Sequence, residues 1–333
     1  MAAQTLTFNK SGYDPFIDFL KAYSIICVVI AHILPADFYK YILFQVWGDM
    51  QVPMFVLIQV FHAYKKGQQP KLKWGSLFKR IVIPFAFVQV VITGFKALIQ
   101  GGVTRNLLIV NVIGGGYGPG SYYIWIYLQI AILLVVIWPW LKRLSLQQTI
   151  LVFLIISVGF EILFSVINLP DWLYRLLCVR YLFLIPLGMI WIEKGVELNW
   201  KTVVLSLLSI AAVLFFVFTN YDLEPIFYNT GWEFHRWICY FYLPILMTYG
   251  LYLVWNKIKT LEWIENVVKW TAARSYEIFL AQMAIFVCFP ASVFGCFISN
   301  TFVRFSIWAI LVFNLSLLFG GIIYWFRKSI LKW

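Results

Sequence analysis

The chain has 333 residues, of which 62% are hydrophobic and only 12% charged, and its mean hydropathy is +0.85. This composition excludes an ordinary soluble domain, because such domains are about half apolar and about a quarter charged. We predict an all-α polytopic integral membrane bundle of about ten transmembrane helices. We expect a single domain over residues 1–333 with no appended soluble domain. The predicted spans lie near residues 14–34, 41–64, 78–98, 121–140, 147–168, 172–192, 201–219, 236–255, 272–295 and 305–326.

The net charge of +12 would suit a nucleic-acid partner, but the placement of the basic residues argues for a membrane instead. With the N-terminus inside, 18 of the 26 basic residues fall in cytoplasmic segments, which is the positive-inside bias. We therefore expect both termini in the cytoplasm, no secretory signal, and a multi-pass protein of the cell inner (plasma) membrane. The five cysteines show neither metal spacing nor a disulfide framework, so we expect no metal.

The first predicted span carries three polar residues that cost free energy in lipid: Asp18, Lys21 and His32. Eleven residues separate Lys21 from His32, which places them on one helix face about 16 Å apart. We expect this face to border a protein interior or a wet channel, with a ligand lying lengthwise between the amine and the imidazole. The alternative is that Lys21 reaches the membrane interface with Asp18 as its partner, while His32 merely caps the helix.

Polar residues of the second span and the following loop extend this pattern. Asp49 is expected at the depth of His32, where a carboxylate would fix the imidazole tautomer and stabilise its cation. Alternatively, Asp49 pairs elsewhere or faces water. His62 is expected at the cytoplasmic interface. The loop after it carries six basic residues between Lys65 and Arg80, which suits either anionic lipid or a phosphate-bearing ligand.

The segment from Gly101 to Ser121 is glycine-rich and is predicted to be an external loop. It does not form a nucleotide cradle, because no strand precedes it. Tyr122, Tyr123 and Trp125 follow it, and exposed aromatic rings of this kind suit stacking on sugar faces. The alternative for these rings is the aromatic belt at the membrane surface.

Charged residues in the later spans are expected to pair within the bundle. Glu161 and Arg180 lie at comparable depth and are predicted to form an ion pair, either structural or in contact with substrate. Glu277 is expected to pair with Lys21 or Arg274. The external segment 220–236 is a candidate lid over the acceptor side, and its His235 is an alternative base.

Taken in order, several of these elements resemble the acyltransferase 3 family of bacterial membrane O-acyltransferases. Lys21 and His32 match that family's first-helix element of an arginine, ten residues and a histidine, with lysine in place of arginine. The segment FKRIVIPF, through Lys79, Arg80 and Pro84, is similar to the family's basic-then-proline start of the third helix.

Two further stretches carry the resemblance into the second half of the chain. RYLFLIPLGM leads with Arg180, as a family stretch also does. ARSYEIFLAQ is similar to a late family motif that often ends in histidine, and Gln282 stands at that place here.

The resemblance implies an O-acyltransferase, expected to be an O-acetyltransferase, for polysaccharide modification. It would move an acyl group from cytoplasmic acyl-CoA, expected to be acetyl-CoA, to a hydroxyl of an exported glycan or lipid-linked sugar. His32 would be the general base with Asp49 beside it. The donor would be bound by Lys21, Lys79 and Arg80. The acceptor would be contacted by Glu161, Arg180, Tyr122, Tyr123 and Trp125.

Two other functions stay open at this point. One is a transporter or flippase for a glycan or lipid-linked sugar, which would need no CoA. The other is a catalytically inactive partner subunit, which the lysine-for-arginine and glutamine-for-histidine departures allow. Membrane lipid is an expected partner in every case, and the oligomeric state is left open, a homo-oligomer among the alternatives.

Overall fold

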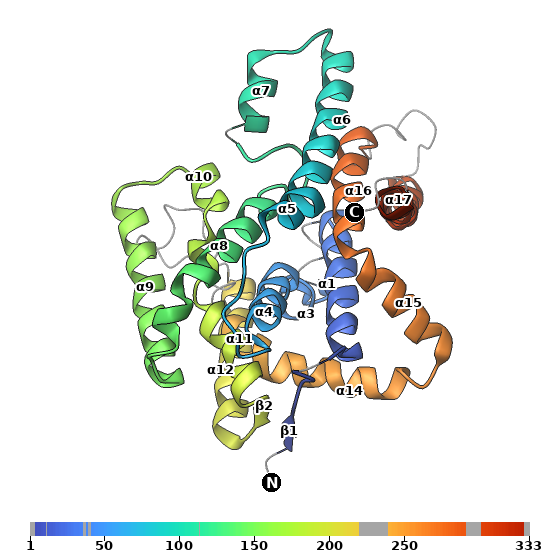
Figure 1. Cartoon of the computed structure of the whole chain (residues 1–333). Helices are drawn as coiled ribbons and strands as arrows, with labels where there is room; N and C mark the ends of the chain where they lie inside the picture. The colour runs from blue at the N-terminus through green and yellow to red at the C-terminus, as the bar shows by residue number, and fades with distance from the viewer. Residues whose placement is uncertain are drawn as a thin grey trace.

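The computed structural model describes residues 4–10, 12–35, 38, 41–112, 114–219, 239–290 and 301–329, and within them the chain is almost entirely helical (Figure 1). Six helical segments of this described part are long and apolar enough to cross a membrane, so the chain is a membrane protein. They are α1 (Pro15–Ile33), the continuous helix formed by α5 (Trp74–Leu77), η1 (Phe78–Val82) and α6 (Ile83–Gln100), α8 (Tyr123–Leu141), α9 (Leu146–Val166), α12 (Trp200–Thr219) and α17 (Thr301–Ser329).

The predicted count of about ten spans is not confirmed, because the other four predicted spans are short or broken in the described chain. Residues 41–64 and 172–192 each divide into separate pieces. The pieces are α3 (Phe44–Trp47), α4 (Gln51–Tyr64), α10 (Asp171–Leu176), the 3₁₀ turn η2 (Cys178–Tyr181) and α11 (Leu184–Glu193). The remaining two regions contain η3 (Cys239–Phe241), η4 (Leu243–Met247), α14 (Thr248–Ile258) and α16 (Ser275–Cys288). The orientation of the termini stays a prediction.

The breaks have local causes that a hydropathy window does not register. Gly48 ends α3, and a Cβ added there would lie 2.2 Å from the Phe44 ring, so the chain turns where only glycine fits. Leu177 is extended between α10 and η2. Broken helices are tolerated at membrane depth when protein surrounds them. These pieces are apolar because they form the core, and not because each spans the membrane alone.

Three elements were not predicted. A two-stranded antiparallel sheet pairs β1 (Gln4–Leu6) with β2 (Val196–Leu198), so the fold is not purely α. The amphipathic helix α15 (Glu262–Ala273) connects α14 to α16, and α7 (Arg105–Val112) follows α6. The charged residues of α15 keep it below the hydropathy of a span.

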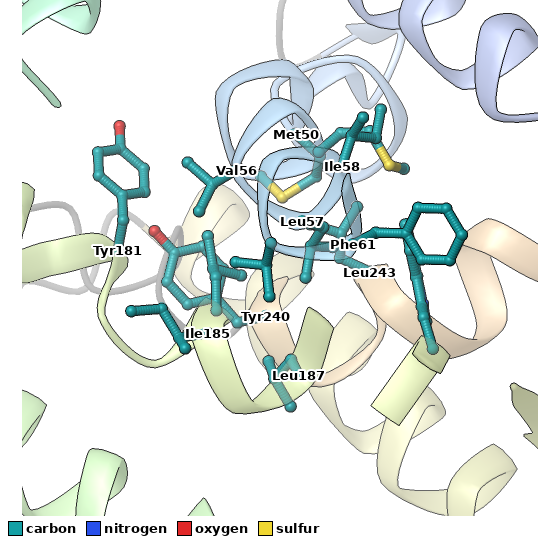
Figure 2. Close-up of a cluster of buried hydrophobic side chains, with 14 of the residues drawn as sticks. Met50, Val56, Leu57, Ile58, Phe61, Tyr181, Ile185, Leu187, Tyr240 and Leu243 are labelled. Carbon is teal, nitrogen blue, oxygen red and sulfur yellow. The ribbon is translucent and has the colours of Figure 1, made fainter. Parts of the chain in front are cut away.

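The core is built around α4, which packs against α1, α8 and α11 near the middle of the molecule (Figure 1). Val56, Leu57 and Phe61 of this helix are completely buried. Figure 2 shows this cluster with Ile185 of α11 and Leu243 of η4. A helix enclosed on several sides must be apolar around most of its circumference, which explains its span-like sequence.

Candidate active site

A cavity of about 1240 Å³ is bordered by α1, α4, η1, the start of α8, the 3₁₀ turn η2 and the start of α16. Most of the predicted site residues line it: Lys21, His32, Asp49, Arg80, Tyr122, Tyr123 and Arg180. The predicted residues Lys79, Glu161 and Trp125 do not line it. Residues from elements far apart in the sequence therefore converge on one chamber.

Two of the helices that line the cavity, α1 and α16, pack against each other and run in the same direction. Ile25 of α1 and Phe279 of α16 belong to one buried cluster, and further along, the rings of His32 and Phe286 lie 6.0 Å apart. Both steps are seven residues, so the helices keep the same register. Lys21 is therefore level with the start of α16, and His32 lies about 16 Å further along.

One end of the cavity is strongly basic. The Tyr276 hydroxyl donates to the Ile81 carbonyl at 2.6 Å, which fixes η1 to the start of α16 and brings Arg80 to the end occupied by Lys21. Lys71 and Lys73 also line the cavity. Such a concentration of cations suits an anionic ligand, and phosphate groups in particular.

Lys79 does not line the cavity, although it was predicted to act together with Arg80. Neighbouring side chains of a helix point in different directions, and here Arg80 faces the chamber while Lys79 does not. The geometry favours Arg80 alone as the cation that η1 contributes.

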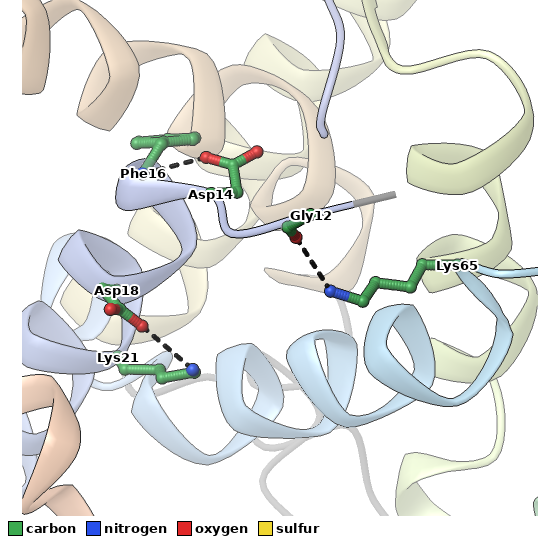
Figure 3. Close-up of polar contacts among 6 residues, drawn as sticks. All are labelled: Gly12, Asp14, Phe16, Asp18, Lys21 and Lys65. Atoms are coloured by element: carbon green, nitrogen blue, oxygen red, sulfur yellow. Dashed lines mark hydrogen bonds and ion pairs between the residues drawn. The ribbon is translucent and has the colours of Figure 1, made fainter. Parts of the chain in front are cut away.

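Lys21 forms an ion pair with Asp18 at 3.0 Å while it lines the cavity (Figure 3). The side chains are 25% and 19% exposed, so the pair is partly shielded. The predicted alternative named the right partner for Lys21, but the amine still reaches the chamber. His62 of α4 lies close enough for the charge of Lys21 to act on its imidazole.

His32, about 16 Å along α1 from Lys21, lines the cavity, and Asp49 lines it as well. The Gln51 amide approaches Asp49 Oδ1 at 3.5 Å, a long hydrogen bond at the first turn of α4. Both residues border the same space, so a carboxylate and an imidazole are available there together. Direct contact between His32 and Asp49 stays a prediction.

The glycine segment forms part of the cavity wall, and its place on the external side of the membrane stays a prediction. Gly114, Gly118, Pro119 and Gly120 line the chamber, and Gly115 is buried. Irregular backbone at membrane depth is tolerated only where it is enclosed by protein or lines a cavity.

Side chains from two helices hold this glycine loop. The Gln89 amide of α6 donates to the Tyr117 carbonyl at 2.9 Å and accepts from the Tyr117 N–H at 2.7 Å. From α16, the Gln282 amide donates to the Pro119 carbonyl at 3.2 Å. The glutamine that replaces the family's histidine therefore positions the loop in this chain.

Comparison with known proteins agrees with this architecture. The sequence model of the family described as "Acyltransferase domain" matches residues 14–325, nearly the whole chain. The chain belongs to the acyltransferase 3 family. It is thus a membrane acyltransferase, a transferase of groups other than aminoacyl groups. The searches of curated proteins and of solved structures return no match.

Glu161 and Arg180 do not form the predicted close ion pair in this acyltransferase, although the charge of Arg180 still acts on Glu161. Glu161 is 2% exposed and accepts a short hydrogen bond from the Tyr174 hydroxyl. The Arg180 guanidinium instead lies over the rings of Tyr122 and Tyr181, at 5.0 and 4.9 Å from their centroids. Glu161 is therefore a structural residue, whereas Arg180 faces the cavity.

Of the three aromatic residues predicted to bind sugar, one lies outside the cavity and two line it. Trp125 donates its indole N–H to the Gly115 carbonyl at 3.1 Å, so it supports the glycine loop from outside the cavity. Tyr123 packs its ring 5.8 Å from that of Phe279. Tyr122 is the one whose ring carries Arg180, and it lines the chamber together with Tyr123.

Two further predictions concerned Glu277 and the charged segment 220–236. Glu277 pairs with Arg327 at 2.7 Å, and not with Lys21 or Arg274 as predicted. This contact is an ion pair and not an aligned hydrogen bond. The candidate lid 220–236 with His235 lies outside the described residues. Among the residues that the structure describes, no cluster of three metal-ligating side chains is present.

Sequence reasoning missed several cavity residues of the acyltransferase. Gln51, Gln59 and His62 of α4 all line the chamber, and Gln59 donates to the Tyr127 carbonyl at 2.9 Å. Their spacing of eight and three residues puts them on one helical face, a polar stripe visible in the sequence. Arg175, five residues before Arg180, was also overlooked.

Proposed function

We propose that this chain transfers an acyl group, acetyl in the first instance, from cytoplasmic acyl-CoA to a hydroxyl of an exported glycan or lipid-linked sugar, in the cell inner membrane. The observation that carries the proposal is the shared cavity wall of Lys21 and His32, about 16 Å apart along α1. A polyanionic nucleotide suits the basic end, and the extended arm of CoA would carry its thioester toward the imidazole. Membership of the acyltransferase family supports the reaction class.

In the proposed mechanism His32 is the general base. The acceptor oxygen attacks the thioester carbonyl carbon, and its proton passes to the imidazole. The carbon–sulfur bond then breaks, and the CoA thiolate takes the proton from the imidazolium. Asp49 would stabilise that cation from the same end of the cavity. Lys21 and Arg80 bind donor phosphates at the other end, where Lys supplies charge without the bidentate geometry of Arg.

The purified full-length protein in lipid nanodiscs would test the donor half of this proposal. Acetyl-CoA and CoA are titrated by calorimetry, with Lys21→Ala as the variant and Lys201→Ala, which lies outside the cavity, as the matched control. We expect Lys21→Ala to weaken CoA binding by about tenfold, the loss of one charge-assisted contact. Affinity equal to that of the control would contradict the donor role of Lys21.

The catalytic half is tested with His32→Ala and labelled acetyl-CoA. We expect unchanged CoA affinity and thermal stability, with transfer to surface glycan reduced by roughly 10²–10⁴-fold. Normal turnover by this variant would remove His32 from the mechanism. If the wild-type protein bound a glycan but neither CoA nor acetyl-CoA, transport would replace transfer as the function.

A further inference from the structure

The lining of the cavity from α10 and η2 is chemically distinct from the donor end. Trp172, Arg175, Arg180 and Tyr181 all border the chamber here. Gln129 of α8 holds this segment in place. Its amide donates to the Leu176 carbonyl at 2.6 Å and accepts from the Cys178 backbone N–H at 3.0 Å. The side chains thus stand on a fixed backbone that is separate from η1 and α1.

Arg180 is the central group of this wall. Its guanidinium carbon lies 5.0 Å from the ring centroid of Tyr122 and 4.9 Å from that of Tyr181, so two aromatic rings hold the cation. Its Nε is buried and makes no hydrogen bond with any residue that the structure describes. A buried donor without an acceptor costs free energy, which a ligand would recover by supplying the acceptor.

The charge balance of the chamber points the same way. Asp49 is the one acidic residue among the described lining residues, whereas Arg175 and Arg180 add positive charge beyond that of the donor end. A planar guanidinium presents N–H groups in a fork that suits two-point contact with a carboxylate or phosphate. The Trp172 ring also lines the chamber and offers stacking surface for a sugar ring.

We infer that Arg180 binds a negatively charged group of the acceptor. The preferred acceptor is then an acidic glycan, with a carboxylate or a phosphate next to the hydroxyl that is acylated. This inference rests on the proposed function and narrows its substrate class. Arg180 binds the acceptor anion through its N–H edges, and Tyr122 and Tyr181 keep the fork oriented. The donor phosphates occupy the separate basic end with Lys21 and Arg80.

The test compares three acceptor series of equal length with labelled acetyl-CoA: hexuronate oligosaccharides, hexose phosphates and neutral hexose oligosaccharides. Binding of each series to the wild-type protein is measured by thermal shift, and transfer is measured separately. We expect one charged series to bind and react at least tenfold better than the neutral series. The charged series that wins identifies carboxylate or phosphate as the group recognised.

Variants then assign the preference to the predicted side chain. Arg180→Lys keeps the charge but loses the planar fork, and it should cut the preference for the charged series roughly 10- to 100-fold while CoA affinity stays unchanged. Arg274→Lys is the matched control, because Arg274 is also stacked between two rings, those of Trp270 and Tyr324, yet does not line the cavity. It should leave the preference intact.

The outcomes distinguish a failure of this inference from a failure of the proposed acyltransferase function. Transfer to neutral and charged acceptors at equal rates would overturn the inference and leave the acyltransferase proposal standing. An Arg180→Lys variant that lost transfer to every acceptor equally would also overturn it, because the residue would then serve the reaction and not the charge. Failure of the wild-type protein to bind CoA would instead defeat the proposed function itself.

Discussion

Substituting Gly118 by alanine adds one methyl group where the glycine loop touches α16. The backbone there has a φ of +98°, and the new Cβ would lie 2.8 Å from Met283 Cβ and 3.0 Å from the Met283 carbonyl oxygen. The backbone of α16 fixes the positions of both Met283 atoms, so a rotamer change relieves neither contact. Strain at such a φ costs roughly 1–3 kcal/mol, and overpacking a further 1–3 kcal/mol. We therefore expect a total loss of about 2–6 kcal/mol.

Thermal unfolding in detergent measures this loss, and we expect a fall in Tm of more than about 5 °C. Transfer activity should fall at least about tenfold, because the displaced loop forms the cavity wall beside the reacting groups. Gly159→Ala is the control: its Cβ meets no atom within 4 Å, so stability should stay constant or rise by up to about 1 kcal/mol. If both variants unfolded and reacted alike, the close approach of the loop to α16 would be refuted.

Two further substitutions test the buried polar contacts by thermal unfolding. Glu277→Gln leaves Arg327 without its counter-charge. Because the Arg327 side chain is only 16% exposed, we expect the free energy of unfolding to fall by roughly 3–5 kcal/mol. Glu265→Gln breaks the more exposed ion pair between Glu265 and Lys269, and we expect it to lower the free energy of unfolding by less than about 1 kcal/mol. Equal losses in the two variants would contradict the argument that burial makes the Glu277–Arg327 pair more important. Tyr174→Phe leaves Glu161 buried without its donor and should cost about 1–3 kcal/mol with unchanged CoA affinity. A changed affinity would mean that Glu161 does reach the cavity.

Local periodicity predicted the part of the site that lies on one helix. Lys21 and His32 share a face because helical geometry places residues eleven apart in register, and the structure puts both on the cavity. The glycine loop was recognisable from composition alone, since its run of glycines permits backbone conformations closed to other residues. Its location was not recognisable, because Gln89 and Gln282 that hold it come from α6 and α16.

Pairings between helices were the least predictable feature. Glu161 and Arg180 carry opposite charges and were predicted to lie at comparable depth. Glu161 instead accepts a hydrogen bond from the Tyr174 hydroxyl, and Arg180 lies over two aromatic rings. Depth restricts which residues are able to meet, but the rotation of each helix about its axis decides which ones do. That rotation is set by side-chain packing across the whole bundle, and no single segment contains it.

The sequence by itself determined that this is an apolar helical membrane protein of the acyltransferase family, and which face of α1 is polar. These properties follow from composition and from the geometry within one helix. Only the tertiary structure decided that α4 and η2 would be short broken pieces in the core, and that the cavity would join Lys21, His32 and Arg180. The physical reason is that a cavity is the space left after helices pack, so its lining depends on contacts between distant segments.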